Sequence, residues 1–176
     1  LGEPRGSQMA QKGIYEVALQ NGTYFIKLSG YLSFNYSAAL SDLVTTITQG
    51  KDTRGVMVDL REAKMIDSTH LGLVARLAIE TQKQIGRQIT IISSVRDVTQ
   101  SLKNTGLQHL ALLLDAPSGD MPAPEAIKAL PESKRNVAEI ILEAHKTLLE
   151  INDDNKAIYQ DIVEMLETSM GKKPNS

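Results

Sequence analysis

The sequence predicts an α/β protein: a mixed sheet of about five strands, the first antiparallel at the edge, with helices packed against the sheet and a helical extension at the C-terminal end. Three observations predict this fold class. Short runs rich in Val and Ile alternate with segments of helical periodicity up to residue 114. Asn21 and Gly22 form a strong hairpin signal between the first two runs. A proline-rich stretch separates this part from a second, purely helical one.

The elements of the first part follow the order β-β-α-β-α-β-α-β. Strands are expected where β-branched and apolar residues cluster, and helices where apolar residues recur every three to four positions. Gly86 and Gly106 stand where two helices should end, because glycine readily adopts the left-handed conformation of a helix C-terminus. The expected strands are residues 14–19, 23–29, 55–60, 88–93 and 111–114, and the expected helices are residues 36–47, 68–85 and 95–104.

The chain is expected to divide at the proline-rich stretch. Residues 1–8 lack the apolar run of a signal peptide and resemble an expression-tag remnant before a natural start at Met9. Prolines fix the backbone and cannot continue a helix, so their cluster predicts a linker. The expected organisation is an α/β domain at residues 9–116, a linker at 117–131, a helical extension at 132–169 and a disordered tail at 170–176.

Apolar residues of the extension keep one helical register on both sides of an Asn/Asp cluster at residues 152–155. Four adjacent Asn and Asp residues are poor helix formers, which favours a turn between two helices packed as a hairpin. The unbroken register favours one long helix instead. The extension is expected either to cover an apolar face of the α/β domain or to mediate homodimerisation or partner docking.

Composition excludes several classes of function. The 19 basic and 21 acidic residues give a net charge of −2, which does not suit a nucleic-acid or membrane-surface binder. With no cysteine there is no disulfide, no thiolate zinc site and no cysteine nucleophile. No apolar run approaches the ~18 residues of a membrane span. The sequence has neither a His-x-x-x-His pair nor a glycine-rich phosphate loop, so we expect no metal and no cofactor.

One candidate site stands at the start of the expected helix 68–85. Asp67, Ser68 and Thr69 can each accept a hydrogen bond from a free backbone N–H of the first turn, which is an ordinary capping role. A helix N-terminus also accommodates a phosphoryl group, because its free N–H groups and its dipole favour negative charge. A hydroxyl here is therefore either part of a cap or a modification site.

The same segment resembles the signature of the STAS family, which includes bacterial anti-sigma factor antagonists. That signature is a strand ending in Asp-Leu, a short loop, and Asp-Ser-Ser/Thr-Gly-Leu-Gly opening a helix. The resemblance covers roughly residues 13–116. The matching pieces are Asp59-Leu60, Asp67-Ser68-Thr69-His70-Leu71-Gly72, Leu28-Ser29-Gly30, and the segment 94–102 with Thr105-Gly106-Leu107.

The resemblance implies a STAS-like fold and a protein without catalytic groups of its own, acting in the bacterial cytoplasm. It implies phosphorylation of Ser68, less favourably Thr69, by an anti-sigma factor that is also a serine kinase of the GHKL type. A PP2C-type phosphatase would remove the phosphate. The unphosphorylated protein would bind the anti-sigma factor, and the phosphorylated protein would release it. The partner-binding residues carried over or placed beside the motif are Asp67, Ser68, Thr69, His70, Ser33 and Asn35.

Two departures from the family pattern bear on the site. His70 replaces a glycine, and we expect a partly exposed ring that could contact a phosphate or a partner. The acid often found after the second strand is absent, so Ser33 and Asn35 could replace it, while Phe34 and Tyr36 are expected to pack. His109 and His145 are expected to be ordinary surface or boundary residues rather than ligands.

Two other functions compete with the switch. A ligand-sensing or scaffold module of a bacterial signalling complex would use the same fold. A small α/β enzyme would need clustered titratable groups, for which the sequence offers Asp59, Asp67 and His70.

Overall fold

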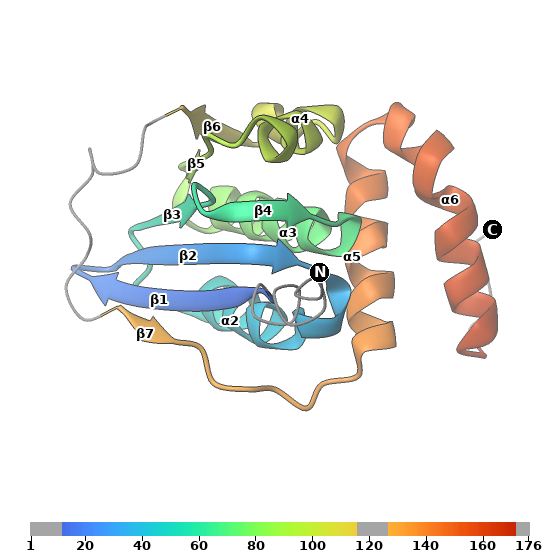
Figure 1. Cartoon of the computed structure of the whole chain (residues 1–176), viewed down its shortest axis with the longest axis horizontal. Helices are drawn as coiled ribbons and strands as arrows, with labels where there is room; N and C mark the ends of the chain where they lie inside the picture. Colours follow the sequence, from blue (N-terminus) through green and yellow to red (C-terminus); the bar gives the residue numbers. More distant parts are fainter. Residues whose placement is uncertain (1–11, 116–126, 172–176) are drawn as a thin grey trace, which may run out of the picture.

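The computed structural model describes residues 12–115 and 127–171 and has the expected α/β architecture (Figure 1). Its elements in chain order are β1 (Ile14–Gln20), β2 (Thr23–Leu32), η1 (Phe34–Tyr36), α2 (Ala38–Gln49), β3 (Gly55–Asp59), β4 (Ala63–Ile66), α3 (Ser68–Ile85), β5 (Ile89–Ile92), α4 (Arg96–Asn104), η2 (Leu107–His109), β6 (Ala111–Leu114), β7 (Lys128–Ala129), α5 (Val137–Ile151) and α6 (Asp153–Ser169).

A single mixed sheet forms the centre of the molecule. Its strand order is β6-β5-β3-β2-β1-β7, and β4 pairs with the end of β2. The predicted hairpin joins β1 and β2 in antiparallel pairing, and Asn21 and Gly22 both have positive φ (51° and 83°), as a two-residue hairpin turn requires. From β2 to β6 the neighbouring strands run parallel. The sequence pattern did not predict the short strands β4 and β7, the second of which pairs with β1 on its outer side.

Helices α2 and α3 lie side by side behind the sheet in Figure 1 and bury its apolar face. Ile26 and Val58 from the sheet meet Val44 and Ala78 from the two helices, and each is at most 1% exposed. Helix α3 spans the predicted residues, because Asp67 caps its start and Gly86 ends it with a left-handed φ of 69°. Helix α2 begins two residues later than predicted, since η1 occupies the preceding turn.

The extension consists of two helices, so the hairpin prediction is correct and the single long helix is wrong. Asn152 is extended (φ −163°, ψ 170°) and its side chain caps α6 by accepting from the N–H of Asn155 at 2.8 Å. Asn155 is fully buried, and its Nδ2 donates to the carbonyl oxygens of Thr105 and Leu148, each at 2.9 Å. The Asn/Asp cluster therefore both breaks the helix and ties the corner of the hairpin to the α/β part.

Helix α5 crosses the molecule at the end of the sheet where β2 and β4 finish, and α6 lies outside it (Figure 1). Helix α5 packs on α3 and also contacts α2 and η1. It begins at Val137 rather than at 132, capped by Asn136, whose side chain accepts from the N–H of Ala138 at 2.9 Å. The extension thus covers part of the α/β domain.

Some predictions fall outside the described residues: the expression-tag remnant, most of the linker, and residues 172–176 of the tail. The described end of the linker contains β7. None of the helices within 12–115 and 127–171 is long and apolar enough to cross a membrane.

Candidate functional site

Ser68 is the first residue of α3 and is half-buried. The residue before it, Asp67, is the N-cap predicted from the sequence. Its Oδ1 accepts from the backbone N–H of His70 at 2.9 Å, and its Oδ2 accepts from the backbone N–H of Phe34 at 2.5 Å. One carboxylate thus holds the loop after β2 against the start of α3. The first turn of α3 is fixed from both sides, which presents the Ser68 hydroxyl at a defined position.

The expectation of a partly exposed His70 is wrong, because its side chain is fully buried. Its Nδ1 lies 2.8 Å from Oδ1 of Asp67 and its Nε2 lies 2.8 Å from the hydroxyl of Tyr15 on β1. With the Nδ1 proton directed at the carboxylate, Nε2 accepts the hydrogen bond that Tyr15 donates. The imidazole links β1 to the cap of α3 and cannot touch a partner or a phosphate at the surface.

Electrostatics keep this chain of hydrogen bonds in one protonation pattern. Burial raises the pKa of the Tyr15 hydroxyl, and the charge of Asp67 raises it further, so Tyr15 remains a donor. Burial alone would raise the pKa of Asp67. The hydrogen bonds from the side chain and the backbone N–H of His70, together with that from the N–H of Phe34, outweigh burial and hold the pKa of Asp67 below its ordinary value. Asp67 is therefore a carboxylate at neutral pH.

Thr69, the second hydroxyl weighed as a phosphate acceptor, is only 2% exposed. Ser68 has the greater access to solvent of the two. Of the two hydroxyl-bearing residues, Ser68 is therefore the more accessible.

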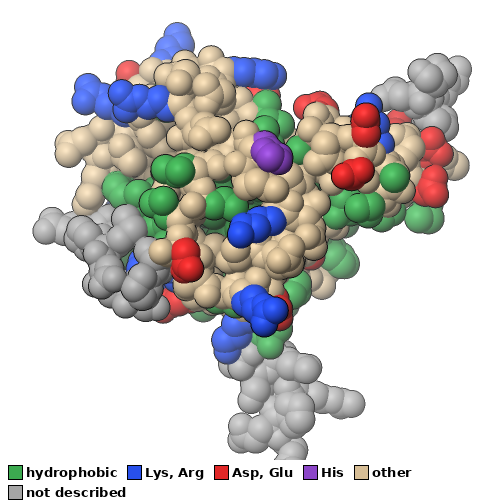
Figure 2. All heavy atoms as spheres, turned by 90° about the horizontal axis from the view of Figure 1, so that it is seen from above, with side chains coloured by type: hydrophobic (Ala, Val, Ile, Leu, Met, Phe, Trp, Pro, Cys, Tyr) green, Lys and Arg blue, Asp and Glu red, His purple; other side chains and the backbone are tan. Residues whose placement is uncertain are grey.

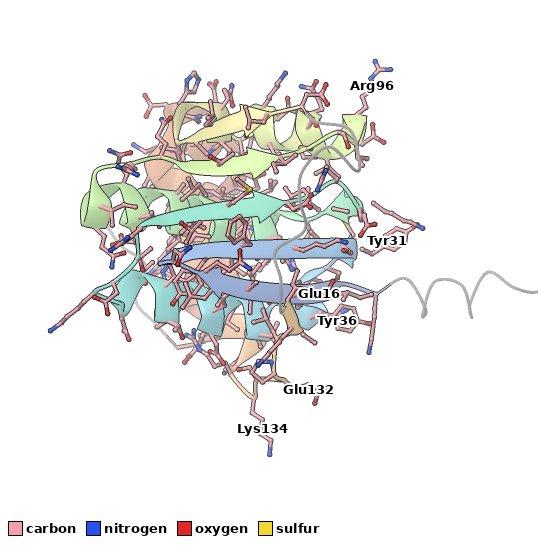
Figure 3. The ribbon with its side chains drawn as sticks, turned by 90° about the vertical axis from the view of Figure 1, so that its left-hand side faces the viewer. Glu16, Tyr31, Tyr36, Arg96, Glu132 and Lys134 are labelled. Atoms are coloured by element: carbon pink, nitrogen blue, oxygen red, sulfur yellow. The ribbon has the colours of Figure 1, made fainter. Side chains whose placement is uncertain are left out.

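An exposed apolar group lies beside the start of α3. Phe34 and Tyr36 were expected to pack, yet each is 43% exposed. Tyr31 pairs with Met65 across β2 and β4, and both are 37% exposed. Tyr31 and Tyr36 point outward on the same side of the molecule in Figure 3. We call this group, together with the adjoining Ser33 and Asn35, the aromatic patch: Tyr31, Ser33, Phe34, Asn35, Tyr36 and Met65.

Asp59 does not join Asp67 and His70 in a cluster of titratable groups. Its carboxylate accepts from Nε and from a terminal nitrogen of Arg61, each at 2.9 Å. Burial raises the pKa of Asp59, but the hydrogen bonds and charge of Arg61 lower it by a larger amount. The net shift of the Asp59 pKa is therefore downward. Within the described ranges 12–115 and 127–171 no group of three or more His, Cys, Asp or Glu could hold a metal ion.

His145 of α5 reaches Ser68 across 77 residues of sequence, which the sequence analysis missed. Its Nε2 lies 2.8 Å from Oγ of Ser68, and its Nδ1 lies 2.7 Å from the carbonyl oxygen of Ile141. A carbonyl oxygen can only accept, so Nδ1 carries the proton, and in the neutral ring Nε2 accepts the hydrogen bond that Ser68 donates. The ring is 4% exposed and packs edge-on against Tyr159 of α6. The expectation of a surface or boundary histidine is wrong for His145 and confirmed for His109, which is exposed.

At Gly72, one turn after Ser68, α5 lies very close to α3. A β-carbon at Gly72 would lie 2.6 Å from the carbonyl carbon and 2.8 Å from the α-carbon of Ala144, and would also collide with the carbonyl oxygen of Ala144. Such distances do not occur between real β-carbons and backbone atoms, so only glycine permits this crossing. The last glycine of the motif and the extension are therefore structurally coupled.

Comparison with known proteins identifies the α/β part. The family model described as STAS domain matches residues 15–116, more than half of the chain. The chain belongs to the STAS family. A search of curated proteins found no match.

Two solved structures share the fold at low identity. An anti-sigma factor antagonist from Mycobacterium paratuberculosis matches with a TM-score of 0.51 at 15% identity, over 60% of this chain and 88% of that one. The Bacillus cell fate determinant SpoIIAA in its phosphorylated form matches with a TM-score of 0.50 at 15% identity, over 59% of this chain and 92% of that one. At this identity the likeness establishes the fold.

The matched STAS segment contains Ser68, Asp67 and the aromatic patch, whereas the C-terminal hairpin of α5 and α6 lies beyond it. The site thus combines a STAS domain with a residue from outside it. One signal in the sequence could have indicated this. His145 stands four residues after Ile141 and three before Leu148, on the apolar stripe of its helix.

Proposed function

We propose that this STAS protein is a phosphorylation-regulated anti-sigma factor antagonist. Unphosphorylated, it binds an anti-sigma factor that is also a serine kinase of the GHKL type and thereby frees the sigma factor. Phosphorylation of Ser68 releases it, and a PP2C-type phosphatase restores the binding form. In this role the protein is a substrate and a switch in the bacterial cytoplasm, with no catalytic group and no cofactor of its own.

The observation that carries the proposal is the position of the Ser68 hydroxyl. Ser68 is partly exposed, it opens α3, and the aromatic patch of the neighbouring loop and strands lies beside it. Exposed aromatic and Met side chains are enriched in protein interfaces. A phosphoryl group on Ser68 would bring about −1.5 to −2 charges to the rim of that surface, next to the Asp67 carboxylate. The added charge would have to be desolvated or repelled by the partner, which weakens binding.

The partner-binding residues divide into two groups under this proposal. Ser68, Ser33 and Asn35 contact the partner directly, together with the exposed rings of the aromatic patch. Asp67, Thr69 and His70 act from beneath by holding the first turn of α3 in place.

A pull-down from cells of the source bacterium tests the proposal, with mass spectrometry of the captured proteins. The Ser68→Ala chain should capture the anti-sigma factor, and Ser68→Asp should bind it roughly 30- to 1000-fold more weakly, equivalent to about 2–4 kcal/mol of repulsion and desolvation. Ser94→Asp is the matched control, because Ser94 is an exposed serine just before another helix, α4. Equal capture by the Ser68→Asp and Ser94→Asp chains would refute the switch.

The ligand-sensing module is tested separately by thermal shift with GTP, ATP and haem. A ligand that binds the folded chain raises its melting temperature, by an amount that grows with ligand concentration. The switch proposal expects no rise with any of these ligands. A rise would favour the sensor.

Homodimerisation through the C-terminal helices is a further part of the proposal. Ile158 and Met165 of α6 are 59% and 64% exposed. At the right of Figure 2 the outer part of the hairpin shows acidic side chains with apolar ones between them. Analytical ultracentrifugation of the unchanged chain and of Ile158→Glu tests homodimerisation. The unchanged chain should be a dimer and Ile158→Glu a monomer. A monomer in both cases would refute homodimerisation.

A further inference from the structure

We propose that the C-terminal hairpin is a built-in cap on the switch: α5 occupies the face of α3 around Ser68 and must move aside before a kinase or partner engages that face. This inference rests on the proposed function and adds a layer of regulation to it. The cap is autoinhibitory. It sets how readily Ser68 is phosphorylated and how tightly the unphosphorylated chain is held.

The first argument is the hydrogen bond between Ser68 and His145. Ser68 donates its hydroxyl proton to Nε2 of His145, so the hydroxyl is already engaged inside the molecule. Phosphoryl transfer requires the serine oxygen to lie in line with the departing phosphate group and its proton to pass to a base. A kinase active site supplies that base itself and needs room around the oxygen, which the buried ring of His145 occupies in this arrangement.

The second argument is the crossing at Gly72. Because the backbone of Ala144 fills the space that a β-carbon at Gly72 would need, α5 lies in direct backbone contact with the face of α3 that carries Ser68. Residues four apart on a helix share one face. A partner that touches this face of α3 therefore competes with α5 for the same surface and cannot bind on top of it.

The third argument is that the hairpin supplies only a small part of the core, so it can move without dissolving the STAS domain. At one end of α5, Arg135 donates to Oγ of Ser41 at 2.8 Å and lies 3.9 Å from Asp42 and 3.7 Å from Glu143. At the other end, Asn155 holds the corner of the hairpin through the carbonyl of Thr105. Besides these polar anchors, α5 gives Ile140, Ala144 and Leu148 to a core cluster whose other buried members all belong to the α/β part.

The cap leaves the aromatic patch uncovered. Tyr31, Phe34, Tyr36 and Met65 remain 37–43% exposed while α5 is in place, and η1, which contains Phe34 and Tyr36, contacts α5. A partner that lands on the patch is therefore positioned at the edge of the cap. Binding there can be followed by displacement of α5, which gives the partner access to Ser68.

Thiol labelling of the full chain tests the cap without any partner, because the protein has no cysteine of its own. Ser68→Cys and, as an exposed reference, Ser94→Cys are each labelled with N-ethylmaleimide and with a maleimide carrying a long polyethylene glycol chain. The thiolate adds to both maleimides by the same chemistry. The ratio of their rates therefore cancels any effect of His145 on thiol reactivity and reports steric access alone.

The expected ratio of large-reagent to small-reagent rate is about 10-fold or more lower for Ser68→Cys than for Ser94→Cys, because the large reagent reacts only through the displaced state. Adding Gly72→Ala, which forces α5 away from α3, should bring the ratio to within about 3-fold of the reference. Gly55→Ala is the matched control: its new β-carbon meets Thr23 Oγ1 at an ordinary 3.4 Å, so the ratio should stay low.

If Gly72→Ala fails to fold, Asn155→Ala decides instead, since it loosens the hairpin without touching α3. Equal ratios for Ser68→Cys and Ser94→Cys in otherwise unchanged chains would overturn the cap. The cap would also be overturned if Gly72→Ala or Asn155→Ala folds and its labelling ratio stays as low as that of the Gly55→Ala control. The pull-down could fail while the labelling ratio of Ser68→Cys is low and rises in a release variant. That pair of results would refute the anti-sigma partner and leave the cap supported. A successful pull-down combined with equal labelling ratios for Ser68→Cys and Ser94→Cys would refute the cap alone.

Discussion

Removing the Asp67 carboxylate should destabilise the protein far more than removing an ordinary surface acid. In Asp67→Ala, α3 loses its N-cap, which costs about 1 kcal/mol. The Nδ1–H of the buried His70 also loses its acceptor, and an unsatisfied buried donor costs about 1–3 kcal/mol. The free energy of unfolding should fall by roughly 2–4 kcal/mol. For a chain of this size that is a drop in melting temperature of about 5–15 °C.

Urea denaturation and thermal melts of Asp67→Ala measure the effect, and Asp97→Ala is the matched control. Asp97 lies in the first turn of α4, is exposed, and follows an N-cap residue whose side chain makes no capping bond. Its removal should change the free energy of unfolding by less than about 0.5 kcal/mol. If the two variants lose the same stability, the carboxylate of Asp67 does not organise the site as argued.

Three further predictions concern stability. Tyr15→Phe removes the donor that faces Nε2 of buried His70 and should cost about 1–2 kcal/mol in urea unfolding. Leu148→Ala leaves a cavity where a fully buried side chain joins α5 to the core, and should cost about 2–5 kcal/mol by the same assay. The pKa of Asp67 is below its ordinary 3.8 in the folded state, so its stabilisation is complete above that value and is lost as pH falls through the folded-state pKa. Urea midpoints measured from about pH 5 downward should therefore fall less steeply in Asp67→Asn than in the unchanged chain.

The fold could be predicted because its signals are local. Asp67 before α3 and Gly86 after it mark both ends of that helix, and Asn21-Gly22 marks the hairpin. Each of these depends on backbone conformations that only a few residue types favour. The strands β4 and β7 have no such signal, since four and two residues are too few to show a period.

The candidate site could be predicted only in its local part. Ser68 and its cap follow from the motif, whereas the partner of the Ser68 hydroxyl comes from a helix 77 residues away and depends on how α5 docks. His70 was expected to be partly exposed. Leu71 and Val74 lie on one apolar stripe of α3. Leu73 and Leu77 continue a second stripe that begins at His70, and it is buried because α3 has the sheet on one side and α5 on another. A helix covered on two sides has no fixed exposed face, so a single stripe understates its burial.

The burial that holds α5 sets how strongly the cap could act. Ile140 and Leu148 are fully buried in the same core cluster, and each is worth about 1.5–3 kcal/mol relative to exposure, so complete release would cost roughly 3–6 kcal/mol. The uncapped state would then hold only about 10⁻² to 10⁻⁴ of the molecules. A partner that requires this state binds with its intrinsic affinity reduced by that fraction, so an intrinsically nanomolar complex would measure between roughly 0.1 and 10 micromolar. A partner able to use the exposed aromatic patch regains part of this cost by displacing α5 itself. Selectivity would then depend on the patch as much as on Ser68, because a protein that fits only the face of α3 meets the full cost of the cap.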